Sequence, residues 1–251
     1  SRNGSPVAAQ PYDPVGALLS RQRAAAPAGA GPGVRGFDRR YASLVLNLLE
    51  RQVARGIDHP RLFEIGYGSG ALLNEVRGYG FPVGGIEVST TMREQAVAIL
   101  GRRHAEGLIL GDRPSVIYWN DVLEHVAPDE AFDYVAHART LLAPGGTLVT
   151  ITPNWLMRPS DVTGDFRPAR SEACGLHLKE YRLAEVVALL KRAGFRRVAT
   201  PLFATRRQMS VVADGFCWPK RMAEPLLDRL PVKLARLLCR GWAMSCTLAT
   251  K

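Results

Sequence analysis

A glycine-rich turn near residue 66 constrains the fold more than any other feature of the sequence. The stretch from Leu62 to Leu73 reads LFEIGYGSGALL. It begins as a short apolar run, passes through glycines at every second position, and continues as a helix-forming run. Glycines permit a tight turn and let a ligand approach the backbone without a Cβ atom in the way. The stretch therefore predicts a strand, a ligand-binding turn and a helix in direct succession.

Strands and helices alternate along the rest of the chain. Such alternation predicts an α/β fold, in which helices cover both faces of a mostly parallel sheet. The expected strands are 61–66, 82–88, 107–110, 116–119, 147–152, 197–202 and 243–250, and the expected helices are 41–53, 71–78, 91–103, 128–142 and 183–193.

Two segments are expected to differ from this core. Residues 1–36 are rich in Ala, Gly and Pro, which oppose regular structure, so we expect a flexible tail or a lid. Residues 37–251 then form the main domain, with a basic amphipathic helical insertion at about 208–242. The chain has 4 Cys residues without C-x-x-C pairs, and no signal-peptide pattern precedes the domain. We therefore expect a cytoplasmic protein with reduced thiols and no metal site.

Charge is distributed unevenly along the chain. The formal net charge is +10, and residues 191–251 hold 13 basic and three acidic residues. Within 222–242, leucines at 226, 227, 230, 234, 237 and 238 are expected on one helical face, and Arg or Lys residues at 229, 233, 236 and 240 on the opposite one. This pattern is typical of a helix on an anionic membrane, here the inner membrane face, but also of a helix packed on its own domain or on a second subunit. All three interpretations, including a homodimer, remain open at this point.

An acidic residue follows the second expected strand. Glu87 lies 17 residues after Gly70, and a carboxylate there can accept hydrogen bonds from both ribose hydroxyls of a nucleoside. The string from Gly66 to Ala71 also fits the relaxed dinucleotide pattern G-x-G-x-x-A, so an NAD enzyme is an alternative.

Further motifs distinguish these nucleosides. Asp121 to His125 read DVLEH after the fourth expected strand, APGG at 143–146 precedes the fifth, and Pro153-Asn154 ends it. With the glycine turn and Glu87, this set resembles the class I S-adenosylmethionine-dependent methyltransferases. It is most similar to the branch of quinone-biosynthesis and natural-product small-molecule O-methyltransferases. The resemblance implies a Rossmann-like sheet with seven strands, of which the last is antiparallel.

The resemblance also implies the cofactor, S-adenosylmethionine, with S-adenosylhomocysteine as product. Glu64 would face the ammonium or sulfonium group, Glu87 would hold the ribose, and Val88 and Met92 would contact the adenine. Asp112 would bind the adenine amino group, although the connection after it is unusually short here. The other residues expected at the cofactor are Gly66, Tyr67, Gly68, Ser69, Gly70, Asn120, Asp121 and Val122.

Two histidines are candidates for catalysis. His125 follows the cofactor-binding strand, and histidine is suited to removing a proton near neutral pH; its alternative role is to cap or pack a helix. His177 lies in a segment that covers the substrate in relatives, and its alternative role is a hydrogen bond to the loop backbone. Cys174, His177 and Glu172 lie close in sequence, but no further ligand accompanies them, so we expect no zinc.

The expected function is therefore methyl transfer from S-adenosylmethionine to a hydroxyl of a small or lipid-linked molecule. The cationic end keeps RNA methylation as an alternative, yet no base-clamping Asn-Pro-Pro-Tyr string follows strand four, and we do not expect a nucleic-acid partner. A non-catalytic protein that binds S-adenosylmethionine is the third alternative.

Overall fold

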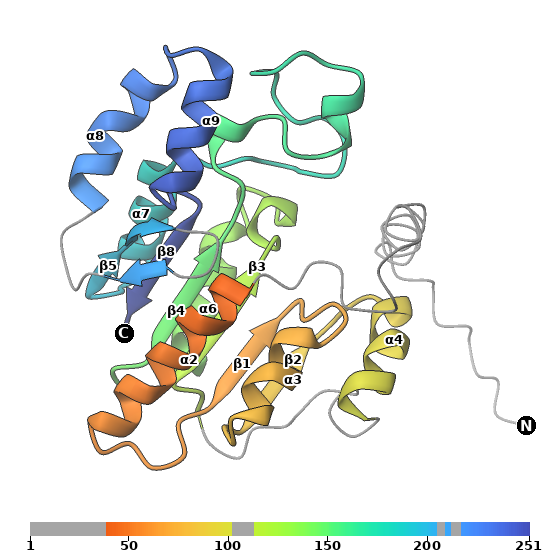
Figure 1. Ribbon diagram of the computed structural model, residues 1–251, viewed down its shortest axis with the longest axis vertical. Coiled ribbons are helices and arrows are strands. Elements are labelled where there is room, and N and C mark those ends of the chain that lie inside the picture. The colour runs from red at the N-terminus through yellow and green to blue at the C-terminus, as the bar shows by residue number, and fades with distance from the viewer. Residues whose placement is uncertain (1–38, 102–112, 205–208, 212–216) are drawn as a thin grey trace, which may run out of the picture.

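The structure, a computed structural model, describes residues 39–101, 113–204, 209–211 and 217–251 (Figure 1). Its centre is a six-stranded sheet in the order β2-β1-β3-β4-β8-β5. β1 pairs in parallel with β2 and β3, and β3 with β4, whereas β8 is antiparallel to β4 and β5. The mostly parallel α/β sheet with an antiparallel last strand is thus confirmed. The strands are β1 (Leu62–Ile65), β2 (Val83–Ile86), β3 (Val116–Asn120), β4 (Thr147–Ile151), β5 (Arg197–Ala199) and β8 (Cys246–Thr250).

The described part of this sheet has six strands rather than the expected seven. The expected strand 107–110 lies outside the described residues, as do the tail 1–36 and Asp112. The expected strand 197–202 is divided, because β5 ends at Ala199 and β6 (Pro201–Ala204) pairs with β7 (Met209–Val211) in a separate two-stranded sheet. Pro201 has no amide hydrogen and cannot continue the ladder with β8.

Helices cover both faces of the sheet (Figure 1). Val116 and Tyr118 of β3 lie in one apolar cluster with residues of α2, α3 and α4. The alternate residues, Ile117 and Trp119, lie in a second cluster with residues of α6 and α7. This alternation follows from the two-residue period of a strand that is buried on both faces. The helices are α2 (Arg39–Ala54), α3 (Ala71–Gly78), α4 (Thr90–Leu100), α6 (Ala131–Leu141) and α7 (Leu183–Arg192).

The strand order creates a switch point between β1 and β3. From β1 the chain passes to β2 on one side, and later returns to β3 on the other side. Connections that leave in opposite directions open a crevice beyond the carboxyl ends of the two strands, which is where α/β proteins bind ligands. The glycine turn follows β1, Glu87 follows β2 and the DVLEH string follows β3, so all three motifs meet at this edge.

The expected helical insertion contains two helices, α8 (Cys217–Leu227) and α9 (Val232–Gly241), on either side of Pro231. They pack on α7 and on the short helix η2 (Trp155–Met157) in a third apolar cluster. None of the helices in the described part of the chain is long and apolar enough to cross a bilayer.

The expectation that six leucines of this insertion share one face is wrong. Leu227, Leu230 and Leu238 pack in the third cluster, whereas Leu226, Leu234 and Leu237 are exposed. The basic face is divided as well, because Arg236 donates hydrogen bonds to the carbonyl oxygens of Met157 and Arg158. The reason is that α9 approaches the domain through the small side chains Ala235 and Cys239, which are both buried.

Candidate functional site

The three glycines of the turn adopt backbone conformations that other residues avoid. Gly66, Gly68 and Gly70 have φ angles of 72°, 54° and 75°. A Cβ atom on Gly66 would lie 2.8 Å from Cγ2 of Val122. The turn therefore lies directly against the segment after β3, and glycine is needed for both its dihedral angle and this close approach.

Glu87 connects the turn to the next helix. One carboxylate oxygen accepts a hydrogen bond from the amide of Gly68 at 2.8 Å, and the other accepts one from the amide of Ser89 at 2.8 Å. Arg93 fixes the backbone here by donating to the carbonyl oxygens of Glu87 and Val88. Since each carboxylate oxygen can accept about two hydrogen bonds, Glu87 keeps capacity for a pair of ribose hydroxyls.

Glu64 has an unusual environment at the end of β1. Its side chain is buried and one of its oxygens, Oε2, has no hydrogen-bond partner. Burial, and to a smaller degree the charge of Glu87, raises the pKa of Glu64 well above its usual range. A buried carboxyl without a partner is costly, and a cationic group would stabilise it. This orphaned oxygen beside the turn fits the ammonium or sulfonium group of S-adenosylmethionine.

The remaining residues expected at the cofactor occupy different environments. Val88 is 48% exposed at the sheet edge, and the neighbouring Ile86, which the sequence analysis missed, is 50% exposed. Two apolar side chains exposed there suit an adenine face. Met92 is buried in α4, and Tyr67 is buried in the first cluster, so only the backbone of Tyr67 is available at the turn. Among the other described members, Asn120 is the last residue of β3, and Ser69, Asp121 and Val122 lie on the two loops that follow β1 and β3.

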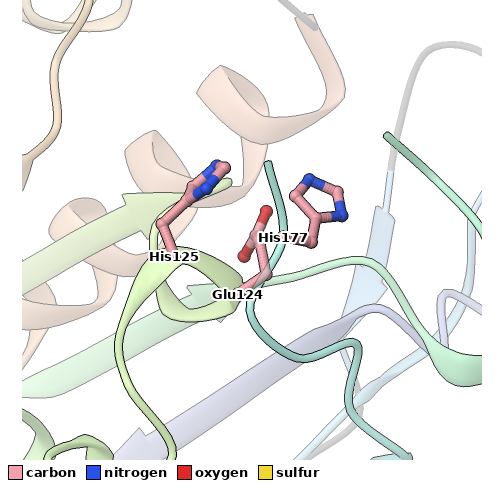
Figure 2. A group of neighbouring side chains, drawn as sticks. All are labelled: Glu124, His125 and His177. Carbon is pink, nitrogen blue, oxygen red and sulfur yellow. The ribbon is translucent and has the colours of Figure 1, made fainter. Parts of the chain in front are cut away.

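The two candidate histidines lie together although 51 residues separate them. The His125 and His177 ring centroids are 5.0 Å apart, with an edge-to-face arrangement. His125 ends the short helix η1 (Leu123–His125) after β3. Glu124 completes the group, and ligand atoms of the three residues lie within 4.8 Å of one another (Figure 2). The buried Glu124 was not expected to take part.

Backbone contacts join the two loops that carry these residues. The carbonyl oxygen of Glu124 accepts hydrogen bonds from the amides of Leu178 and Lys179. Asp161 holds the other side of this loop, since its carboxylate accepts hydrogen bonds from the amides of Leu176 and His177. Together with a hydrogen bond from Thr163, these contacts lower the pKa of Asp161 to about 2. The loop is therefore anchored at both ends of the histidine-bearing stretch.

The acid–base properties of the group follow from its burial. Burial and the charge of Asp121 raise the pKa of Glu124 to about 8. Burial also lowers the pKa of His125, which outweighs the opposing hydrogen bond to the Leu176 carbonyl oxygen. His125 is thus neutral at neutral pH, with a lone pair available for a proton or another Lewis acid.

Cys174, His177 and Glu172 do not form a ligand set. Cys174 is an exposed free thiol whose Sγ atom contacts the hydroxyl of Thr163, and Glu172 is exposed. Within the described residues, the group with metal-ligating chemistry is the one formed by Glu124, His125 and His177. The sequence signal for it was the Glu-His pair in the DVLEH string, but nothing local indicated that His177 would join this pair.

Residues 35–200, from just before α2 through β5, match a family described as a methyltransferase domain. A search of curated proteins gives no match. Among solved structures, the chain is similar to a SAM-dependent methyltransferase from Archaeoglobus fulgidus, with 16% identity, 84% of this chain and 94% of that chain covered, and a TM-score of 0.49.

Two further solved structures contain SAM or its product SAH. Magnesium protoporphyrin IX methyltransferase from Synechocystis, with bound SAH, is 21% identical over 79% of this chain and 92% of that chain, with a TM-score of 0.49. An amino pentose methyltransferase from Micromonospora echinaspora, with bound SAM, is 24% identical over 59% of this chain and 58% of that chain, with a TM-score of 0.37.

Proposed function

Because the chain belongs to the methyltransferase-domain family and its cofactor is S-adenosylmethionine, we propose that it methylates a hydroxyl group of a small or lipid-linked molecule. The observation that supports this most is the position of the His125–His177 pair. His125 follows β3 at the sheet edge, on the segment whose Val122 meets the glycine turn, and His177 contacts it from the loop before α7. A proton acceptor therefore stands next to the place where the donor binds.

These positions indicate which roles belong to the methyl donor and which to the side chains of the protein. S-adenosylmethionine supplies a methyl group on a sulfonium, which is already activated for displacement. Glu64, the glycine turn and Glu87 hold this donor, and the remaining task is to remove the hydroxyl proton of the acceptor. In the simplest mechanism Nε2 of His125 takes that proton, since Nδ1 is held at the carbonyl oxygen of Leu176, 3.0 Å away.

Replacing Glu87 with alanine tests the donor site. We expect Glu87→Ala to weaken binding of S-adenosylhomocysteine by at least about tenfold, because it removes an acceptor for the ribose and also the contact that orders Gly68. Isothermal titration calorimetry measures this change. Glu94→Ala, an exposed position on α4, is the matched control. Equal affinities of the two variants would contradict the assignment of Glu87, and binding of NAD by the unaltered protein would revive the dinucleotide alternative.

The C-terminal helices support a lipid-linked acceptor. Trp218, Met222 and Leu226 are 67%, 61% and 63% exposed and follow one another at four-residue spacing along α8, so they form one row. Beside this row, Leu202, Phe203, Pro219, Lys220 and Trp242 line an apolar hollow of about 310 Å³. Lys233 and Arg240 are exposed on α9, and Arg229 is exposed in the connection between α8 and α9. An apolar row with cations beside it suits an anionic lipid surface.

A vesicle assay tests this surface. We expect the full chain to co-sediment with phosphatidylglycerol vesicles more than with phosphatidylcholine vesicles, and added salt to weaken the binding. The double variant Trp218→Ser/Leu226→Ser should bind at least about tenfold more weakly, because two large apolar side chains no longer enter the lipid. Tyr79→Ser, which changes an exposed aromatic residue after α3, is the control. Absence of vesicle binding would contradict the proposal, and a stable dimer in light scattering would instead assign the row to a second copy.

The two other functions predict different results with a labelled methyl donor. RNA methylation requires label in bulk RNA, and a non-catalytic binding protein would bind the donor without labelling any acceptor. Hydroxylated small molecules or lipid extracts that become labelled, while RNA stays unlabelled, would support the proposed function.

A further inference from the structure

We propose that Glu124, His125 and His177 bind a divalent transition-metal ion such as Zn²⁺ or Mn²⁺. Each residue offers one ligand atom, and these atoms lie within 4.8 Å of one another. Figure 2 shows the carboxyl group of Glu124 between the two imidazole rings. Two imidazole nitrogens and one carboxylate oxygen form a common ligand set for such ions. The proposal departs from the expectation of no metal, which considered a different set of residues.

The outer partners of both imidazoles favour the metal-binding tautomer. Nδ1 of His125 lies 3.0 Å from the carbonyl oxygen of Leu176, and Nδ1 of His177 lies 2.9 Å from the carboxylate of Glu180. Both partners accept hydrogen bonds, so each Nδ1 atom is the donor and Nε2 is the nitrogen left for a ligand. Metal-ligating histidines typically donate their second N–H to a carbonyl or carboxylate in this way.

Glu124 provides independent support, because it is fully buried and incompletely hydrogen-bonded. The hydroxyl of Thr152, which follows β4, donates to Oε2 of Glu124 at 2.8 Å and so fixes the carboxyl plane. The other oxygen, Oε1, has no hydrogen-bond partner. A buried polar atom of this kind costs free energy unless a ligand satisfies it. A cation held between the two imidazoles would satisfy it.

The surroundings of the group are acidic. Glu180, at 3% exposed, accepts hydrogen bonds from His177 and from the amide of Ser160, and Asp161 accepts from the amides of Leu176 and His177. Acidic side chains thus lie beside the two imidazoles, and such surroundings favour a bound cation. The ligands are also held in place before binding, since Glu124 and Asp161 accept hydrogen bonds from the backbone of the loop that carries His177, and Glu180 bonds the His177 imidazole.

The chemical role of the ion rests on the proposed function. An ion beside the donor site would bind the acceptor oxygen and make its hydroxyl proton easier to remove, as metal ions do for bound water. In that case His125 acts as a ligand, and the proton leaves to solvent or to a neighbouring carboxylate. The preferred acceptor would then present a hydroxyl with a second oxygen close to it, because such a pair chelates the ion.

Calorimetric titration of the full chain with Zn²⁺ and with Mn²⁺, after treatment with EDTA and removal of the chelator, tests the proposal. We expect about one ion to bind per chain. His177→Ala should weaken this binding by more than about 100-fold, because loss of an outer partner alone commonly costs about 10- to 100-fold. Glu180→Gln changes only the outer partner of His177, so it should weaken ion binding by about 10- to 100-fold.

Two matched variants control for adventitious ions. His137→Ala removes an exposed histidine of α6, and Cys174→Ser removes the exposed thiol nearest to the loop. Both should bind the ions as the unaltered chain does. Binding of S-adenosylhomocysteine by His177→Ala shows that this variant is folded, since the donor site lies on other residues.

The possible results test the metal site and the proposed methyl transfer separately. Failure of both ions to bind, or equal binding by His177→Ala, overturns the metal site. If methyl transfer persists in EDTA while neither ion binds, the proposed function is supported and the metal site is rejected. If an ion binds to the unaltered chain and the variants as expected, but no acceptor is ever labelled, the metal site is supported and the proposed function is rejected.

Discussion

Replacing His125 with alanine is expected to lower kcat by about 10²- to 10⁴-fold, the usual contribution of a group that assists proton transfer. The reason is positional, since His125 lies on the loop that meets the glycine turn and pairs with His177. The loss is expected whether His125 takes the proton itself or holds an ion that assists its removal. The affinity for S-adenosylhomocysteine should stay unchanged, because Glu64, Gly66–Gly70 and Glu87 are intact.

The measurement is a steady-state assay with labelled S-adenosylmethionine on an acceptor that the unaltered chain methylates. His137→Ala is the control, because it removes a histidine that is exposed on α6. The double variant His125→Ala/His177→Ala should lose little more than the single variant, since residues that act as a unit give non-additive losses. Unchanged turnover of His125→Ala would remove this residue from the catalytic machinery.

The parts of the site that the sequence predicted are those determined by local chemistry. Positive φ angles at Gly66, Gly68 and Gly70 require glycine, so the turn is visible in the sequence itself. Glu87 is visible for a related reason, because the parallel strands β1 and β2 end at the same edge. Motif order along the chain then placed the DVLEH string at that edge.

The parts that could not be predicted depend on contacts between distant segments. His177 reaches His125 because the amides of Leu178 and Lys179 bond the carbonyl oxygen of Glu124, and backbone hydrogen bonds leave no mark on residue type. The Glu124 oxygen without a hydrogen-bond partner could not be predicted either, because its surroundings come from segments that are distant in the sequence. On α9, helical periodicity alone grouped the leucines, whereas the small residues Ala235 and Cys239 decided which face is buried.

Asn154, which belongs to the Pro-Asn motif after β4, has its role determined by contacts that the sequence does not indicate. Asn154 is 2% exposed, its Oδ1 atom accepts a hydrogen bond from the amide of Leu156, and its Nδ2 atom donates to Glu224 at 2.9 Å. The side chain therefore caps η2 and binds α8, which makes its role structural.

Glu224→Ala is expected to reduce the free energy of unfolding by about 3 kcal/mol. The buried carboxylate of Glu224 also accepts hydrogen bonds from the amides of Leu183 and Ala184, so it links α8 to the start of α7 and to the end of β4. Its removal leaves buried donors without an acceptor, and each such donor costs about 1–3 kcal/mol. Against a total stability of about 5–15 kcal/mol this is a large fraction.

Urea unfolding followed by circular dichroism measures this loss. Glu94→Ala, which truncates an exposed glutamate of α4, should change the stability by less than about 0.5 kcal/mol. Glu224→Gln keeps one acceptor oxygen, so its loss of stability should lie between those of Glu94→Ala and Glu224→Ala. Because Asn154 also bridges Tyr181, close to His177, the weakened link should lower turnover more than it lowers the affinity for S-adenosylhomocysteine. A Glu224→Ala chain as stable as the control would show that the three donors find other acceptors, and that α8 is held by its apolar contacts alone.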